Sequence, residues 1–142
     1  MMNHKILRAE KEINVRFSEV DSMGIVWHGN YATYFEDARE VFGRLYHLEY
    51  LYIFEKGYYA PLVDLQIRYK KAIRYNDRIK IVVEYQDSEA AKIIFNYQIL
   101  HAETGELMAT GQTTQFFLNP DYTLALQVPE FFNEWKRLNG II

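Results

Sequence analysis

Three residues that could carry out chemistry lie close together in the stretch VDSMGIVWHGNYATYFEDARE, residues 20–40. Asp21 is an acid, and a carboxylate can act on an acyl carbon as a nucleophile or a general base. Gly24 allows the backbone to come close to a ligand. His28 could orient a water molecule or polarise a carbonyl group. Their spacing therefore suggests an acyl-transfer or hydrolytic site.

Each residue also has an ordinary structural explanation. An acid just before a helix is more often a turn or cap residue. A single histidine beside an aromatic helix more often packs or forms a hydrogen bond. Only the combination of Asp21, Gly24 and His28 in one short loop favours the chemical interpretation.

The element that must position this loop is an amphipathic helix of about four turns. Its predicted buried face consists of Tyr31, Tyr34, Phe35, Ala38, Val41, Phe42 and Leu45. Its predicted polar face consists of Thr33, Asp37, Arg39, Glu40 and Arg44. We expect Asn30 to be the N-cap.

The start of this helix suits a developing oxyanion, because its first backbone N–H groups are unpaired and the dipole is positive there. The residues at this terminus are Trp27, His28, Gly29 and Asn30. Gly29, like Gly24, would let the backbone approach a ligand.

Most of the remaining chain is predicted to form strands. Residues 10–17 alternate between apolar and polar side chains, and residues 62–73, 78–87, 91–102 and the region after the turn at 103–106 are rich in strand-forming residues. Residues 128–138 predict a short C-terminal helix with Pro129 near its start. One long apolar helix against an antiparallel sheet is an α+β arrangement.

Composition narrows the function further. The chain has 142 residues, which fits a single domain over 1–142, and 16% of them are aromatic, which is more than a core this small usually needs. We expect some aromatic residues to cover a subunit interface. A net charge of −3 argues against a general nucleic-acid binder. There is no cysteine, which excludes disulfides, thiolate metal sites and a cysteine nucleophile.

No apolar stretch resembles a signal-peptide core or a membrane span, so a cytoplasmic protein is expected. We also expect no metal and no cofactor.

The motif from Asp21 to Tyr31, followed by a helix with Glu36 and Arg39, resembles the signature of hotdog-fold acyl-CoA thioesterases. The nearest branch is the 4-hydroxybenzoyl-CoA thioesterase family, including small bacterial enzymes associated with the Tol-Pal system. The resemblance covers nearly the whole chain and includes Arg74-Tyr75-Asn76-Asp77. It implies a five-stranded antiparallel sheet wrapped around one long central helix.

The resemblance also implies roles for individual residues. Asp21 matches the catalytic carboxylate, and the backbone N–H groups around His28 match donors that polarise the thioester carbonyl. The His28 side chain matches a histidine implicated in the Tol-Pal branch. Gly24 matches the loop glycine, and Asn30 and Tyr31 match residues that frame the pocket. Trp27 and the pair Gly29-Asn30 depart from the usual pattern, which puts the acyl preference in doubt.

In such folds two subunits join their sheets edge to edge, active sites lie at the dimer interface, and dimers often pair into tetramers. A CoA thioester would be the substrate. The basic residues Arg68, Lys70, Lys71 and Arg74 could bind its phosphates. They could equally solvate and protect an exposed strand. Alternation places Arg68 and Lys70 outward.

Several alternatives stay open. Hydrolysis of an acyl group carried on acyl carrier protein (ACP) would require the same chemistry, and a non-catalytic acyl-CoA-binding protein could use the same fold. A hotdog dehydratase is disfavoured because no His-Phe-Pro sequence occurs, although Glu36 could serve as an alternative acid. Tyr52, Phe54, Tyr58 and Tyr59 are expected mostly in the core or an interface rather than in an acyl pocket.

Overall fold

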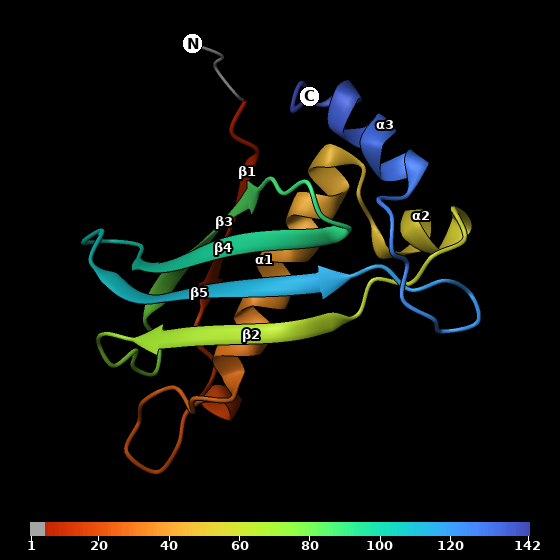
Figure 1. The fold of residues 1–142 in the computed structure, drawn as a ribbon. Coiled ribbons are helices and arrows are strands. Elements are labelled where there is room, and N and C mark those ends of the chain that lie inside the picture. The colour runs from red at the N-terminus through yellow and green to blue at the C-terminus, as the bar shows by residue number, and fades with distance from the viewer. Residues whose placement is uncertain (1–4) are drawn as a thin grey trace.

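The structure, a computed structural model, describes residues 5–142 as a curved sheet packed against one long helix (Figure 1). The strands are β1 Arg8–Asn14, β2 Leu62–Tyr69, β3 Arg78–Gln86, β4 Lys92–His101 and β5 Leu107–Phe116. The helices are α1 Asn30–Tyr46, α2 Tyr50–Glu55 and α3 Glu130–Leu138, with a 3₁₀ turn at Phe17–Glu19. The expected order of strand, long helix, four strands and short helix is confirmed, although α2 was not predicted.

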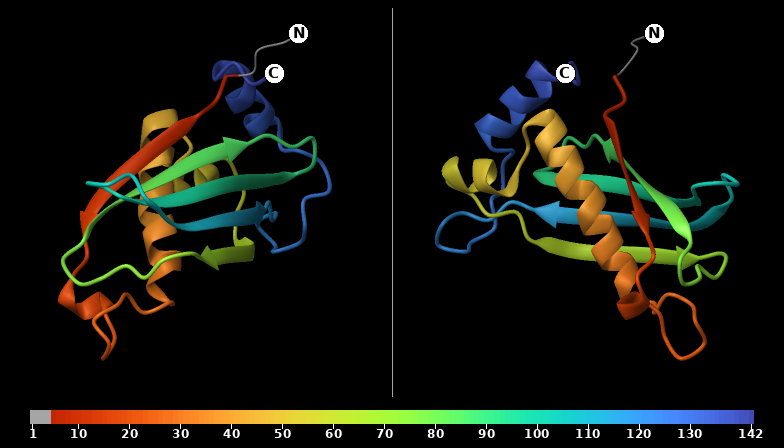
Figure 2. Two further views of the ribbon diagram at one scale, coloured as in Figure 1. Left: turned by 90° about the vertical axis from the view of Figure 1, so that its left-hand side faces the viewer. Right: turned by 180° about the vertical axis from the view of Figure 1, so that it is seen from behind.

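The sheet is antiparallel throughout, with strand order β1-β3-β4-β5-β2. The strands β1 and β2 are therefore its two edges. The helix α1 runs diagonally across one face, as the view from behind shows (Figure 2). Side chains alternate along the central strands, so every second residue meets this helix. Those that are almost fully buried include Ile79, Ile81 and Val83 on β3 and Ile93, Phe95, Tyr97 and Ile99 on β4.

The apolar face of α1 is confirmed over most of its length, but Leu45 is an error of prediction. Tyr34 and Ala38 are fully buried, Val41 is half-buried and Leu45 is 57% exposed. These four residues form one row along the helix. Because α1 crosses the sheet diagonally, this row leaves the sheet toward the C-terminal end.

Two polar residues of α1 also differ from expectation. The N-cap is Gly29 rather than Asn30, whose side-chain amide instead donates to the Glu19 carbonyl at 2.8 Å. Arg39 was assigned to the polar face, yet only 23% of its side chain is exposed. Arg39 lies one turn from both Phe35 and Phe42, so it shares the face that packs on the sheet.

The helix α3 closes the end of the core beside the last turn of α1. The Trp135 indole N–H donates to the Tyr46 carbonyl at 2.8 Å, and the Trp135 ring stacks on Phe132 with centroids 5.3 Å apart. Lys136 is buried and its Nζ contacts Asp87 Oδ1 at 2.8 Å, just after β3. These contacts attach the C-terminal helix to both α1 and the sheet.

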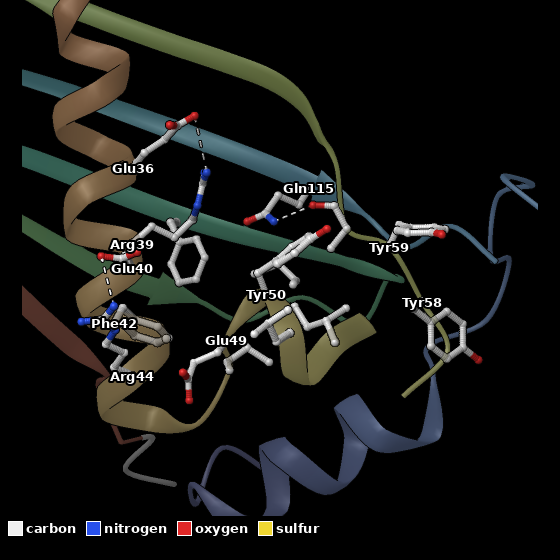
Figure 3. Close-up of a pocket in the computed structure, with 17 residues that line it drawn as sticks. Glu36, Arg39, Glu40, Phe42, Arg44, Glu49, Tyr50, Tyr58, Tyr59 and Gln115 are labelled. Carbon is white, nitrogen blue, oxygen red and sulfur yellow. Dashed lines mark hydrogen bonds and ion pairs between the residues drawn. The ribbon is translucent and has the colours of Figure 1, made fainter. Parts of the chain in front are cut away.

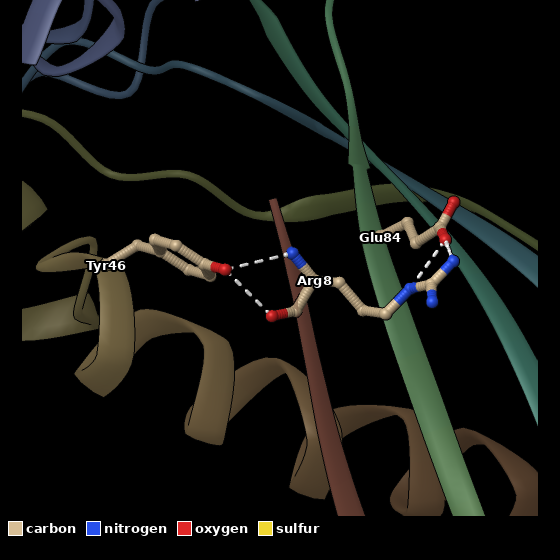
Figure 4. A network of polar contacts seen from close by, with 3 residues as sticks. All are labelled: Arg8, Tyr46 and Glu84. Atoms are coloured by element: carbon tan, nitrogen blue, oxygen red, sulfur yellow. Dashed lines mark hydrogen bonds and ion pairs between the residues drawn. The ribbon is translucent and has the colours of Figure 1, made fainter. Parts of the chain in front are cut away.

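The outer edge of β1 is partly closed by α1 (Figure 4). The Tyr46 hydroxyl accepts from the Arg8 backbone N–H at 3.1 Å and donates to the Arg8 carbonyl at 2.9 Å. The Arg8 side chain lies across β3, where its Nε donates to Glu84 Oε1 at 2.7 Å. These backbone groups of Arg8 are thus unavailable to another strand.

No helix within residues 5–142 is long and apolar enough to cross a membrane. The expectation that the chain has no signal peptide rests in part on residues 1–4, which lie outside the described residues.

Candidate active site

The loop that leads into α1 brings Asp21 and His28 to one cavity of about 400 Å³. The other residues of this catalytic-loop cavity are Met23, Ile25, Val26, Tyr31, Tyr69, Lys70, Lys71 and Ala72. Its walls therefore come from the loop, the first turn of α1 and the end of β2. The predicted acid and histidine do share a site.

A tight turn holds the Asp21 carboxylate. Its Oδ1 accepts the Met23 backbone N–H at 2.8 Å, and the Gly24 N–H donates to the Asp21 carbonyl at 3.0 Å. Gly24 has φ of +76°, a left-handed conformation that glycine adopts without strain. Within the described residues, Asp21 Oδ2 receives no hydrogen bond, so this oxygen remains available to a substrate or water.

The start of α1 is fixed in place by Glu19. The Glu19 carbonyl accepts the Trp27 N–H at 2.9 Å as well as the Asn30 side chain. The backbone N–H groups of His28 and Gly29 donate to no acceptor in residues 5–142. Two unpaired donors at a helix N-terminus can hold a negatively charged oxygen.

The His28 side chain is exposed at the cavity and rests against the Trp27 ring, with ring centroids 4.9 Å apart. The His28 backbone carbonyl accepts a hydrogen bond from the Tyr69 hydroxyl at 3.2 Å. This contact ties the helix start to the end of β2.

Tyr31 forms the buried floor of the cavity and meets Tyr69 edge to face at 4.6 Å between centroids. Burial, and secondarily the neighbouring Tyr69, raises the pKa of Tyr31 to about 12. Tyr31 is therefore a neutral phenol at ordinary pH and can donate a hydrogen bond but not act as a base.

Among the other predicted site residues, Gly24, Gly29 and Asn30 shape the loop but do not line the cavity. At Gly29 a Cβ would overlap the Trp27 ring, so the glycine permits that ring to fold back.

Of the predicted basic residues, Lys70 and Lys71 line the cavity, whereas Arg68 and Arg74 are exposed and outside it. Lys71 also pairs with Glu106 at 2.7 Å.

Glu36 is not brought to Asp21. It lines a second cavity of about 430 Å³, bounded by the C-terminal half of α1, by α2 and by β4 and β5 (Figure 3). We call this the distal cavity. Tyr58 and Tyr59 line it, and Tyr58 also packs on the core, as expected for most of these aromatic residues.

Tyr69 is the notable residue of the catalytic-loop cavity that sequence reasoning missed. Tyr69 lies 41 positions after His28, and only the sheet brings the two together. No group of three or more His, Asp or Glu side chains in residues 5–142 could hold a metal ion.

Comparison with known proteins decides the family. The model of the Thioesterase-like superfamily matches residues 15–136. The chain belongs to this superfamily. Relatives of the chain are named acyl-CoA thioesterases and thioester hydrolases, so the chain is a thioester hydrolase. The resemblance seen in the sequence is confirmed at the level of the superfamily.

Individual relatives agree with this assignment. The chain is similar to a DHNA-CoA thioesterase from Staphylococcus aureus of known structure, with 31% identity, a TM-score of 0.81, and coverage of 92% of this chain and 87% of that one. It is 29% identical to YneP, a candidate acyl-CoA thioesterase of Bacillus subtilis (strain 168), over 89% of this chain and 91% of the relative. It is 24% identical to a 1,4-dihydroxy-2-naphthoyl-CoA hydrolase of Thermosynechococcus vestitus, over 96% and 92%. The predicted hotdog fold is confirmed.

Proposed function

We propose that this thioesterase-family member hydrolyses acyl-CoA thioesters at the catalytic-loop cavity. One observation carries the proposal: Asp21 borders the same cavity as His28, whose backbone N–H donates to no acceptor in residues 5–142. The carboxylate supplies an acid group beside a site suited to a developing oxyanion. The names of the relatives support an acyl-CoA substrate.

In the proposed reaction, the thioester oxygen accepts a hydrogen bond from the His28 backbone N–H at the start of α1. As a general base, Asp21 takes a proton from water, the hydroxide forms a bond to the carbonyl carbon, and the carbon–sulfur bond breaks. The proton then passes to the departing thiolate, which leaves a free acid and CoA. Alternatively, the Asp21 carboxylate attacks the carbonyl carbon itself, and the carbon–sulfur bond breaks to release the CoA thiolate. Water then hydrolyses the mixed anhydride to the free acid and the Asp21 carboxylate, and its remaining proton goes to the thiolate.

Positive charge at the mouth of the cavity fits the CoA phosphates. Lys70 and Lys71 line the cavity, and Arg68 and Arg74 are exposed nearby in the sequence. Lysine and arginine form charge-assisted contacts with phosphate. ACP is the alternative carrier, because its acidic surface would meet the same residues. The protein is proposed to act in the cytoplasm without a cofactor.

The free edge of the sheet at β2 favours a homodimer. Pairing of β1 with another strand is disfavoured by Tyr46, which occupies the Arg8 backbone groups, and by exposed charged residues. These charged residues are Arg8, Glu10, Lys11 and Glu12. β2 instead exposes the apolar side chains Leu62, Val63 and Leu65. Long edges with apolar side chains normally pair with another strand. We propose a second copy of this chain as the partner, with further pairing into a tetramer as the resemblance implies.

Charge complementarity suggests the register of that pairing. If two β2 strands run antiparallel with Gln66 at their centre, Asp64 of each lies opposite Arg68 of the other. Both residues are exposed and lie on the sheet face that points away from Ile67 and α1. Opposite charges directly across two strands stabilise the pairing.

The acyl group is proposed to be fatty or aromatic. Relatives whose names specify dihydroxynaphthoyl-CoA favour the aromatic alternative. Membership of the 4-hydroxybenzoyl-CoA branch with its Tol-Pal-associated enzymes is likewise a proposal, supported by the motif from Asp21 to Tyr31.

Release of free thiol from a panel of acyl-CoAs tests this function, with the matching acyl-ACPs assayed beside them. We expect turnover of at least one acyl-CoA, with acyl-ACP slower. Turnover of acyl-ACP alone would favour the other carrier. Saturable binding of acyl-CoA without thiol release would instead indicate a non-catalytic binding protein.

A further inference from the structure

The motif Arg74-Tyr75-Asn76-Asp77 forms a tight turn, and the proposed function uses only its Arg74 charge. The turn lies between β2 and β3, and the Asp77 N–H donates to the Arg74 carbonyl at 3.1 Å. Asn76 has φ of +69°, a left-handed conformation that asparagine adopts more readily than most residues. Asparagine at this position therefore suits the turn, which we call the 74–77 turn.

The backbone at the start of this turn pairs with the loop that leads into α1. The Val26 N–H donates to the Ile73 carbonyl at 2.7 Å, and the Tyr75 N–H donates to the Gly24 carbonyl at 3.0 Å. Between these two contacts, Ile25 forms an isolated antiparallel bridge with the first residue of the turn. Residues 73–75 therefore support the loop from behind, as a neighbouring strand would.

The Asp77 side chain holds the turn in shape. Its Oδ2 accepts the Arg74 N–H at 2.9 Å, and its backbone carbonyl accepts the Val15 N–H at 2.8 Å. Its Oδ1 lies 3.7 Å from His101 Nε2. Because His101 Nδ1 accepts the Glu103 N–H at 3.3 Å, the proton of a neutral imidazole is on Nε2, facing Asp77. Both carboxylate oxygens of Asp77 thus face a donor, which restricts the rotation of this side chain.

We propose that Asp77 is a positioning residue, which places Asp21 and His28 by way of the 74–77 turn. This inference rests on the proposed function. Asp77 does not border the catalytic-loop cavity, so it acts on the loop and not on the thioester. Its bond from the Arg74 N–H fixes the backbone with which the loop pairs. A displacement of reacting groups by about 1 Å can cost about 10²-fold in rate.

Thiol release by Asp77→Ala and Asp77→Asn measures the kinetic effect. Alanine removes the acceptor of the Arg74 N–H, so we expect kcat to fall about 10- to 100-fold while KM changes by less than about threefold. Asparagine keeps an oxygen that can accept this N–H, so Asp77→Asn should recover most of the lost kcat. Such recovery separates positioning from proton transfer, because an amide does not replace a reacting carboxylate.

Ser88→Ala is the matched control for a loss of stability. Ser88 Oγ accepts the Ala90 N–H at 3.1 Å, so alanine at this position also removes a hydrogen bond from a side chain to the backbone of a turn. Ser88 lies after the end of β3, whereas Asp77 immediately precedes its start. Urea unfolding should show lower stability in both alanine variants. Only Asp77→Ala should lose kcat at temperatures where both are folded.

Trp27 gives a readout that does not depend on turnover. It lies in the loop and is 52% exposed, whereas the other tryptophan, Trp135, is 2% exposed. Quenching of tryptophan fluorescence by acrylamide therefore reports mainly on the loop. The Trp27 ring now rests on His28, so a loosened loop should expose it further. We expect Asp77→Ala to raise the quenching constant, Asp77→Asn to restore it, and Ser88→Ala to leave it unchanged.

Either wild-type kcat or unchanged Trp27 quenching in a folded Asp77→Ala protein would overturn the inference. It would also be overturned by an Asp77→Asn protein as defective as Asp77→Ala, or by an equal loss of kcat in Ser88→Ala. Absence of thiol release from any acyl-CoA by the wild type would instead reject the proposed function. In that case Trp27 quenching would still show whether Asp77 holds the loop.

Discussion

Asp21 reaches the start of α1 because the chain turns back at Gly24, whose positive φ few other residues adopt easily. The Gly24 carbonyl also accepts the Tyr75 N–H at 3.0 Å, which fixes the loop against the segment between β2 and β3. The position of the acid therefore depends on one backbone conformation.

Gly24→Ala tests this dependence. A Cβ at Gly24 would meet nothing within 4 Å, so the substitution adds backbone strain of about 1–2 kcal/mol without a clash. Gly140→Ala is the matched control, because Gly140 has φ of +71° in equally open space beyond α3. Denaturant unfolding should show similar destabilisation in both. Only Gly24→Ala should lower kcat/KM at temperatures where both variants are folded, and equal kinetic effects would contradict the role of the loop.

At this scale the sequence indicated that Asp21 and His28 lie in one short loop, since both are among the nine residues that precede α1, and their catalytic roles stay predictions. Local spacing could not reveal Tyr69, because the sheet brings it to His28 from a distant strand. Arg39 was wrongly assigned to the polar, solvent-facing side of the helix because its side chain is charged. Its position one turn from Phe35 and Phe42 was the signal that it faces the sheet.

At the scale of elements, α1 lies close to the sheet because β5 carries a glycine beneath it. A Cβ at Gly111 would overlap the Phe35 ring and lie 2.9 Å from the Gln66 carbonyl oxygen. The neighbouring residue Thr110 points to the other face of the sheet.

Gly111→Ala should therefore destabilise the fold. Overpacking of a tight core commonly costs about 1–3 kcal/mol, and we expect a loss in that range from urea unfolding. Thr110→Ala, one residue away on the opposite face, should cost less. If Gly111→Ala were as stable as the wild type, close packing of α1 at this point would not matter to stability.

The attachment of α3 should depend on pH. Partial burial alone would raise the pKa of Asp87, but hydrogen bonds from Lys136 and Tyr85 outweigh this effect and hold the pKa of Asp87 below its ordinary value. The resulting stabilisation is present above the unfolded-state pKa of about 3.9 and is lost as pH falls through the lower folded-state pKa.

Urea unfolding at pH 6 and pH 3 measures this effect. The wild type should lose more stability on acidification than Asp87→Asn, which has no carboxylate to protonate. Glu89→Gln, an exposed neighbour, should behave like the wild type. Equal acid-dependent losses in the wild type and Asp87→Asn would argue against this contribution.

At the scale of the whole molecule, the two edges of the sheet are unlike: β1 carries exposed charges and is partly closed by Tyr46, whereas β2 exposes apolar side chains. Charge exchange tests the proposed register. Asp64→Arg and Arg68→Asp should each weaken the dimer in analytical ultracentrifugation by placing like charges opposite each other. The double exchange should restore it. A dimer unaffected by either single change would place the interface elsewhere or in another register.

The order of elements and the antiparallel sheet were predictable because alternation and helical periodicity are local. The short helix α2 was missed because six residues carry little periodic signal. The strand order, with β2 at one edge and β1 at the other, depends on long-range pairing that no local pattern encodes. The single domain over 1–142 stays a prediction.

Asp21→Asn tests the central claim most directly. Asparagine retains an oxygen that can accept the Met23 N–H, so the turn should survive while the reacting carboxylate is lost. In a thiol-release assay on the best acyl-CoA substrate, we predict that kcat falls by about 10²–10⁴-fold with little change in stability. A folded Asp21→Asn protein with wild-type kcat would contradict the assignment of Asp21 as the catalytic acid group.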